Sequence, residues 1–182
     1  HGQTTGRNVV EERIMKKLTL GIAILAMAGV ASATILVPNG DFENGGANWT
    51  EAFGGGAVSF AYEASGGNGG GYATIDAGAG AWAVLVNPPE AGAAGGGIPI
   101  GDIGVTAGTV ETFTIDLITL SGAAGGGLKV EAWAGNVLLD YQPDVLAPAS
   151  ATWQTLQFDW LVPAGTEKMI FVPIWGNESK IG

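Results

Sequence analysis

Beyond Ala33 the chain consists of short runs in which apolar and polar residues alternate, separated by clusters of glycine. Side chains two positions apart share one face of a strand, so Phe113, Ile115 and Leu117 form an apolar face with polar residues between them. No segment shows the sustained 3.6-residue period of an amphipathic helix. The pattern predicts strands at 35–37, 57–62, 72–75, 82–86, 112–120, 128–134, 137–141, 152–160 and 169–175. We therefore predict an all-β fold, a β-sandwich of two antiparallel sheets.

Glycine clusters mark the predicted loops, because glycine adopts positive φ without steric cost and weakens the interior of a strand. They lie at 54–56, 65–71, 92–97 and 123–127. The segment 88–103 is rich in glycine and proline and lacks an alternating pattern, which predicts a long surface loop.

The run 128–134 provides the clearest candidate binding face. Apolar residues at 128, 130 and 132 share one side, which leaves Lys129, Glu131 and Trp133 on the wetter side. Aromatic rings stack on the C–H faces of sugars, while carboxylates and amides hydrogen-bond to sugar hydroxyls. This face therefore suits a carbohydrate, the alternative being that tryptophan only fills the core.

Three further aromatic residues are candidates for the same surface. Phe171 and Trp175 oppose aliphatic residues at 170, 172 and 174, and the pattern does not decide which face of that strand is wetter. Nor does it place Trp82 or Tyr141. The predicted ligand-binding residues are thus Trp133, Trp175, Tyr141, Trp82 and Glu131.

The composition of the chain argues against several classes of function. The 182 residues carry 7 Lys+Arg against 17 Asp+Glu, a net charge of −10, which argues against nucleic acid and against an anionic membrane surface as partners. There is no cysteine, and the single histidine is His1, so a cysteine nucleophile, a Ser-His-Asp triad and a multi-histidine zinc site are excluded. Binding is therefore favoured over catalysis.

The N-terminal residues have the pattern of an export signal. Lys16 and Lys17 precede an apolar run at 18–30 that ends in Ala31-Ser32-Ala33, a small-x-small cleavage site. We interpret 15–33 as a signal peptide, with an N-terminal membrane anchor as the alternative, and 1–14 as an upstream leader or gene-calling artefact. The mature protein would then be 34–182, secreted or on the bacterial cell surface. It would hold three lysines, no arginine and fifteen acidic residues, a net charge of −12.

The segment from Val37 to Trp49, VPNGDFENGGANW, resembles the opening of carbohydrate-binding modules of the family 4/9 type, which are galactose-binding-like jelly rolls. Later segments keep the family's order: GYATI at 71–75, WAVLV at 82–86, AGT at 107–109 before FTI at 113–115, and Trp153 with Phe158 and PAG at 163–165. The resemblance covers 35–182. It implies a jelly-roll sandwich that binds polysaccharide without catalysis, with Trp49 and Trp153 in the core.

The resemblance also implies a structural calcium ion and a missing last strand. Family members bind calcium through an N-terminal glutamate and nearby carbonyls, which correspond here to Glu43 and Asp41, together with a C-terminal aspartate. In the family a closing strand follows the point where this sequence stops, at Gly182. A downstream catalytic domain in a longer protein would be a natural partner.

Two other functions remain open from the sequence. A structural or adhesive surface protein with a lost C-terminal sorting tail would also be short, exported and β-rich. A glycoside hydrolase fragment would need two carboxylates at a set separation. The candidates for that role are Asp116, Glu131, Asp140 and Asp159, and no motif pairs them.

Overall fold

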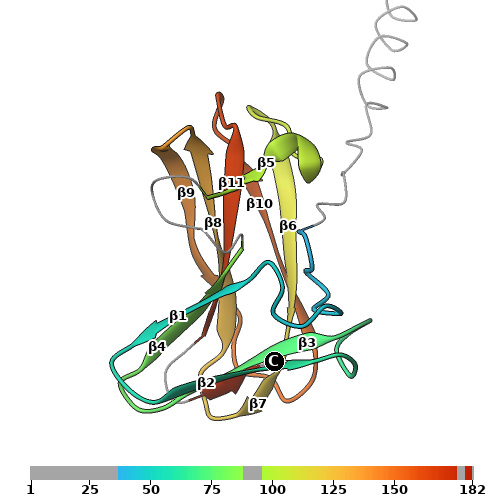
Figure 1. Cartoon of the computed structure of the whole chain (residues 1–182), viewed down its shortest axis with the longest axis vertical. Coiled ribbons are helices and arrows are strands. Elements are labelled where there is room, and N and C mark those ends of the chain that lie inside the picture. Colours follow the sequence, from blue (N-terminus) through green and yellow to red (C-terminus); the bar gives the residue numbers. More distant parts are fainter. Residues whose placement is uncertain (1–36, 88–95, 176–178, 182) are drawn as a thin grey trace, which may run out of the picture. The chain divides into compact units, whose positions relative to one another are not determined.

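Twelve strands and one short 3-10 helix form the described part of the chain, residues 37–87, 96–175 and 179–181 of the computed structural model (Figure 1). The elements are β1 (Thr50–Gly54), β2 (Val58–Glu63), β3 (Tyr72–Ala77), β4 (Trp82–Val86), β5 (Ile98–Pro99), η1 (Ile100–Asp102), β6 (Val110–Leu117), β7 (Thr119–Ser121), β8 (Gly126–Ala134), β9 (Val137–Leu146), β10 (Gln154–Leu161), β11 (Lys168–Trp175) and β12 (Ser179–Ile181). No helix within these ranges is long and apolar enough to span a bilayer. The predicted all-β class is confirmed.

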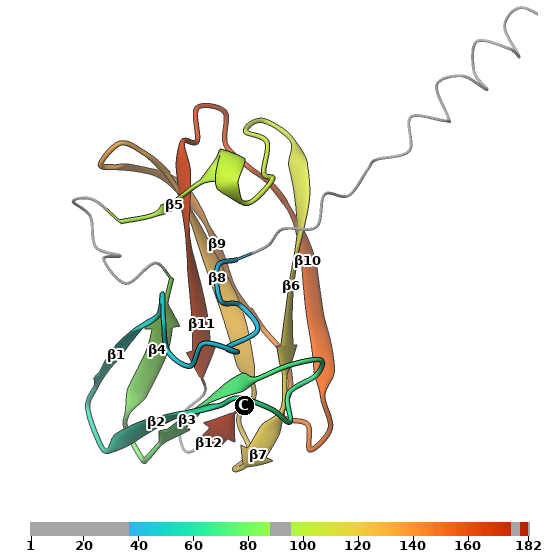
Figure 2. The same cartoon turned by 45° about the vertical axis from the view of Figure 1, so that its right-hand side comes forward.

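The strands form two layers, and every pairing is antiparallel. One layer is a six-stranded sheet of order β1-β4-β11-β8-β9, in which β5 also pairs with β11. The other layer combines a four-stranded sheet, β2-β3-β12-β7, with a two-stranded sheet, β10-β6. Only Ile118 separates β6 from β7, so one chain segment joins these two sheets (Figure 2). The result is the predicted β-sandwich.

Two large apolar cores and a small cluster of Leu117 with Ala147 hold the layers together. The larger surrounds Phe113 of β6, whose ring centroid lies 6.2 Å from those of Trp160 of β10 and Phe171 of β11. The smaller joins Ile75 of β3 to Leu85 of β4, both fully buried. Because each core contains residues of both layers, burial fixes which face points inward for the strands that contribute to the cores.

The two tryptophans assigned to the core, Trp49 and Trp153, are both partly buried, and only Trp49 packs against one of the cores. Trp49 packs against the smaller core, and its ring stacks on Phe42 with centroids 5.1 Å apart. The ring of Trp153 meets that of Tyr72 edge to face, with centroids 5.8 Å apart.

Most strands form where the alternation predicted them, and the differences have clear causes. Strand β1 was not predicted, because its alternation in TEAFG is short and runs into glycines. Of the predicted strand 35–37, only Val37 is described, and it lies outside any strand. The prediction of a surface loop over 88–103 is wrong for its last part, because Ile98 and Ile103 are 6 % and 2 % exposed in the larger core. Residues 88–95 lie outside the described residues.

Strand β12 was also missed by sequence reasoning. Residues 179–181 lie between β3 and β7 in the four-stranded sheet, where the sequence analysis predicted no strand. Its three residues are too few for a pattern of alternation to appear.

The loop at 39–49 is organised by one side chain, that of Asn39. Its amide nitrogen donates hydrogen bonds to the carbonyls of Gly45 and Ala47 at 2.8 and 2.6 Å, and its amide oxygen accepts one from the Asn44 N–H at 3.0 Å. The Asn39 carbonyl accepts a hydrogen bond from the Trp49 indole at 2.9 Å. Asn39 also has φ of 53°, a left-handed conformation that asparagine tolerates better than most residues. The motif that carries the family resemblance is therefore a structural turn.

Replacing Asn39 with alanine should lower the free energy of unfolding by roughly 2–3 kcal/mol, because three hydrogen bonds are lost and alanine is strained at positive φ. Urea denaturation monitored by tryptophan fluorescence would measure this. Asn44→Ala, in the same loop but with no side-chain hydrogen bond among the described residues, should cost much less. Asn39→Gly should recover the part due to φ. An Asn39→Ala variant as stable as the wild type would contradict this role.

Candidate functional site

The outer face of the six-stranded sheet, the face turned away from the second layer, holds three of the predicted binding residues together. Leu128, Val130 and Ala132 of β8 enter the larger core, so Lys129, Glu131 and Trp133 point outward. Tyr141 of β9 is the register partner of Glu131 and shares its face. We call Lys129, Glu131, Trp133 and Tyr141 the β8 cluster.

Hydrogen bonds and charge link the members of the β8 cluster. The indole N–H of Trp133 donates to Oε2 of Glu131 at 3.1 Å. The Lys129 ammonium lies 2.5 Å from Oε1 of the same carboxylate. Its nitrogen also lies 5.2 Å from the centroid of the Tyr141 ring, within range of a cation–π interaction. The Glu131 carboxylate thus binds both the Trp133 indole and the Lys129 ammonium, and the ammonium in turn contacts the Tyr141 ring.

The β8 cluster is partly shielded from solvent at its centre and open at its rim. The Glu131 side chain is 16 % exposed and that of Lys129 29 %, whereas Tyr141 is 47 % exposed. Partial burial strengthens the ion pair relative to one in bulk water and reduces the freedom of the tryptophan. The arrangement presents two aromatic rings with fixed polar groups between them, as required for stacking against a sugar ring and bonding to its hydroxyls.

Neighbouring strands extend this surface with residues that the sequence did not identify. Trp133 is the register partner of Leu138 of β9 on one side and of Lys168 of β11 on the other. Lys168 in turn pairs with Pro99 of β5, which is exposed. These cross-strand neighbours are far from Trp133 in sequence, so no local pattern could have revealed them.

Trp82 lies on the same outer face but apart from the β8 cluster. It is 53 % exposed on β4, and its indole packs over Gly54 of the neighbouring strand β1. A Cβ added to Gly54 would lie 2.8 Å from Nε1 of that indole, so the glycine allows the ring to lie flat. Val84 of β4 pairs with Ile174 of β11, and Trp133 pairs with Lys168 of the same strand. At the usual rise per residue, these registers place Trp82 roughly 26 Å from Trp133, measured along the strands.

Trp175 stays a prediction. Its backbone pairs with Gly126 of β8, but its side chain lies outside those that the structure describes. Phe171, which the alternation grouped with Trp175 on the same face, is 2 % exposed in the larger core. Lys168 lies on the opposite face and is partly exposed, but Ile170 and Val172 on that face are 3 % and 9 % exposed, so both faces of β11 are apolar and buried beyond Lys168.

The two residues predicted to bind calcium lie in the loop organised by Asn39. Asp41 and Glu43 are both exposed, and the Glu43 N–H donates to Oδ1 of Asp41 at 3.3 Å. A Cβ built on Gly70 would lie 3.4 Å from the Asp41 carbonyl oxygen and 3.8 Å from Oε1 of Glu43, so both oxygens face the loop at 66–71. No group of three acidic or histidine side chains occurs among the described residues, so carbonyls or water would have to supply the other ligands.

Two of the other carboxylates weighed for hydrolysis, Asp116 and Asp159, are engaged in other contacts. Asp116 of β6 accepts hydrogen bonds from Thr155 and from Asn68, and Asp159 of β10 accepts one from Thr112. All these residues belong to the second layer or its loops, whereas Glu131 lies on the outer face of the six-stranded sheet.

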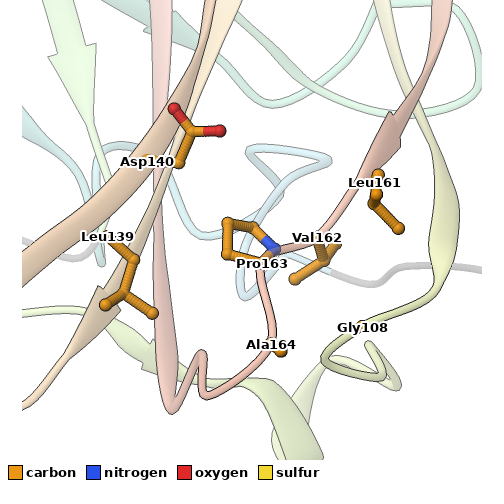
Figure 3. Close-up of a pocket in the computed structure, with 7 residues that line it drawn as sticks. All are labelled: Gly108, Leu139, Asp140, Leu161, Val162, Pro163 and Ala164. Carbon is orange, nitrogen blue, oxygen red and sulfur yellow. The ribbon is translucent and has the colours of Figure 1, made fainter.

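An open hollow of about 460 Å³ lies near Asp140, lined by Gly108, Leu139, Asp140, Leu161, Val162, Pro163 and Ala164 (Figure 3). Leu139 of β9 and Leu161 of β10 lie on opposite sides of the segment at 162–164, and the Asp140 carboxylate points away from them. A lining of aliphatic groups offers few partners for sugar hydroxyls, so the β8 cluster is the better candidate site.

Burial of Tyr62 of β2 in the smaller core raises the pKa of its phenol, and the hydrogen bond to Glu51 and the charge of that carboxylate act in the same direction. The phenol donates to Oε1 of Glu51 at 3.0 Å, which ties β1 to β2. This contact supports the position of β1, on which the indole of Trp82 rests.

No protein-family model matches the chain, and no curated protein matches its sequence. Solved structures do match. The enzymatically active domain of tailspike protein 4 of bacteriophage CBA120 is similar at a TM-score of 0.61 and 12 % identity over 81 % of this chain, which spans 20 % of the tailspike chain.

Two similar structures are carbohydrate-binding modules of comparable length. The C-terminal family 22 module of Clostridium thermocellum Xyn10B has a TM-score of 0.52 and 12 % identity, covering 83 % of this chain and 90 % of that one. TmCBM61, solved in complex with β-1,4-galactotriose, has a TM-score of 0.50 and 12 % identity, covering 81 % and 91 %. At this identity the likeness establishes the fold alone. The fold is that of β-sandwich carbohydrate-binding modules, and these neighbours are not of the family 4/9 type.

The contact between Gly54 and Trp82 can be tested by a double-mutant cycle. Gly54→Ala should destabilise the wild type, because its Cβ would meet the indole at 2.8–3.2 Å, and should cost less when Trp82 is alanine. We expect a coupling energy of about 1 kcal/mol from thermal or urea unfolding. Gly101→Ala, which meets no atom within 4 Å, is the matched control. Equal costs of Gly54→Ala in both backgrounds would contradict the packing described.

Proposed function

We propose that this chain is a non-catalytic carbohydrate-binding module that holds a polysaccharide on the outer face of its six-stranded sheet. The observation that carries the proposal is the β8 cluster, in which Trp133 and Tyr141 are fixed around the Glu131 carboxylate on one outward face. Aromatic rings beside hydrogen-bonding groups form the usual chemistry for sugar recognition.

Each member of the β8 cluster has a distinct part in the proposed site. Trp133 provides the principal stacking ring, and its hydrogen bond to Glu131 holds it before any ligand arrives. Tyr141 provides a second, more exposed ring and a hydroxyl group. Glu131 and Lys129 present polar atoms between the rings while neutralising one another. A site held in this way loses little side-chain entropy on binding.

The similar structures support a polysaccharide ligand. TmCBM61 was solved with a galactotriose, and the study of the Xyn10B module concerns residues in a ligand-binding cleft. We extend this ligand class to the present chain as part of the proposal, and the resemblance of residues 37–49 to the family 4/9 type remains part of that proposal. The proposal includes export of the mature part, 34–182, to the bacterial surface or medium, with a downstream catalytic domain as the natural partner.

Binding is tested by affinity electrophoresis of the chain in gels that contain xylan, β-1,4-galactan, β-glucan or mannan, followed by calorimetry with oligosaccharides of the polymer that retards it. Trp133→Ala should weaken binding at least tenfold, because a stacking platform at the centre of a binding site is often an energetic hot spot. Tyr141→Ala should weaken it less.

Trp82→Ala is the matched control, since it removes an exposed tryptophan from the same face but roughly 26 Å away along the strands. It should leave the affinity for short oligosaccharides almost unchanged. If Trp133→Ala is folded and binds like the wild type, the β8 cluster is not the site. If the wild type binds none of the polymers, the structural or adhesive role would be favoured instead.

We also propose that the loop at 39–49 binds a structural calcium ion through Glu43 and the Asp41 carbonyl, with the ion bracing the loop against the segment at 66–71. Calcium should then raise the melting temperature of the wild type, by mass action on the folded state. Glu43→Gln should abolish that rise, whereas Asp102→Asn, an exposed acid in η1, should keep it. A melting temperature insensitive to calcium and to chelator would reject the proposal.

A further inference from the structure

Positive charge in this protein is scarce and is concentrated next to the β8 cluster. The mature part has three lysines, no arginine and no histidine against fifteen acidic residues. Two of the three lysines, Lys129 and Lys168, lie on the same outward face as Trp133. Scattered solubilising charges would not be expected to gather in this way on an acidic molecule.

The two lysines differ in what they contact. Lys129 is neutralised by Glu131 at 2.5 Å and lies over Tyr141. Lys168 has no ion pair or side-chain hydrogen bond among the described residues. Within the described ranges, its charge is therefore unpaired, whereas that of Lys129 is neutralised by Glu131.

The position of Lys168 is fixed by its strand and by a glycine. Met169 and Phe171 of β11 are in the larger core, so Lys168 points outward, and it is the direct register partner of Trp133. Its aliphatic stem lies against Gly97, where a Cβ would be 2.7 Å from Cδ and 2.9 Å from Cγ of the lysine. Register partners have Cβ atoms about 5 Å apart, so the free ammonium and the indole can reach the same sugar ring or adjacent rings.

The net charge of the whole molecule limits what kind of acidic ligand is suitable. A net charge of −12 on the mature part repels a polyanion at long range, and one free ammonium cannot offset a carboxylate on every sugar. A mostly neutral chain that carries isolated carboxylates avoids most of this repulsion. It can still place one carboxylate beside Lys168.

We propose that Lys168 is a specificity-determining residue that recognises a uronic acid substituent on an otherwise neutral polysaccharide, while Trp133 stacks on the sugar ring. The inference rests on the proposed carbohydrate-binding function and adds the ligand class to it. The contact is an ammonium–carboxylate pair at a partly exposed site, so it contributes selectivity more than affinity.

The test compares two uronate-bearing polymers, glucuronoxylan and a glucuronate-containing arabinogalactan, with the same polymers after chemical reduction of their carboxylates to alcohols. The wild type should bind at least one native polymer about three- to fivefold more tightly than its reduced form at low salt. The difference should shrink at high salt, because screening weakens the pair. Polygalacturonate, a polyanion, should bind less well than the preferred native polymer.

Three variants separate the role of Lys168 from a structural one. Lys168→Gln keeps much of the aliphatic stem that packs on Gly97 but removes the charge, so it should bind native and reduced polymers equally. Lys168→Arg keeps the charge and should retain the preference. Lys129→Met should weaken binding to both polymers without changing their ratio, because it disturbs Glu131 rather than the ligand's carboxylate.

The ratio of the two affinities decides the inference. Equal binding of native and reduced polymers by the wild type, or an unchanged ratio in Lys168→Gln, overturns it while leaving the carbohydrate-binding function in place. Binding only to neutral polymers such as galactan and mannan also overturns it. If the chain binds no polysaccharide of any kind, the proposed function itself fails, and this inference fails with it.

Discussion

The packing of Phe113 between the two layers determines which residues of the protein face solvent. Its ring stacks on that of Phe158, with centroids 5.6 Å apart, and its centroid lies 6.2 Å from that of Phe171 in the opposite layer. With Phe171 held inward, strand alternation forces Lys168 outward, and the register to β8 then places Trp133 beside it. A slip of one residue in either strand would bury the charged residues and expose the core, so the same contact that stabilises the sandwich also defines the candidate site.

Glycine residues allow side chains and carbonyl groups to approach the backbone closely at several places on the surface. Gly54 lies beneath the indole of Trp82, and Gly97 lies beneath the aliphatic stem of Lys168. A Cβ on Gly71 would lie 2.6 Å from the carbonyl oxygen of Glu63 and 3.0 Å from that of Asp41. Glycine in a folded chain costs conformational entropy. In return, large side chains lie flat against backbone and lose their own freedom before any ligand binds. The chain has no cysteine, so this packing restricts the surface without any disulfide.

How far the sequence predicts the site depends on whether the relevant information is local. Strand β8 alternates cleanly between apolar and polar residues, so the outward position of Glu131 and Trp133 could be predicted from seven consecutive residues. Strand β11 is apolar on both faces, so its wetter face could not be identified, and Lys168 was overlooked. Its partnership with Trp133 depends on a register between strands 35 positions apart, which alternation alone does not specify. The same limit applies to Trp82, whose role depends on the glycine of a strand that sequence reasoning missed.

Fold likeness at 12 % identity leaves the chemistry of the site to be argued from the residues themselves. The chemistry of the β8 cluster depends on one carboxylate, that of Glu131. Glu131 is 16 % exposed, and an unpaired carboxylate at that depth would be costly, so Lys129 and the Trp133 indole together satisfy it. This pairing neutralises the charge of Lys129, whereas Lys168 has no ion pair among the described residues. In the proposed site, a neutral pair beside an unpaired ammonium would discriminate between glycans by charge without binding polyanions strongly. Residues 34–182 hold fifteen acidic residues against three lysines, and long-range repulsion by this negative charge permits recognition of isolated carboxylates but disfavours a polyanion.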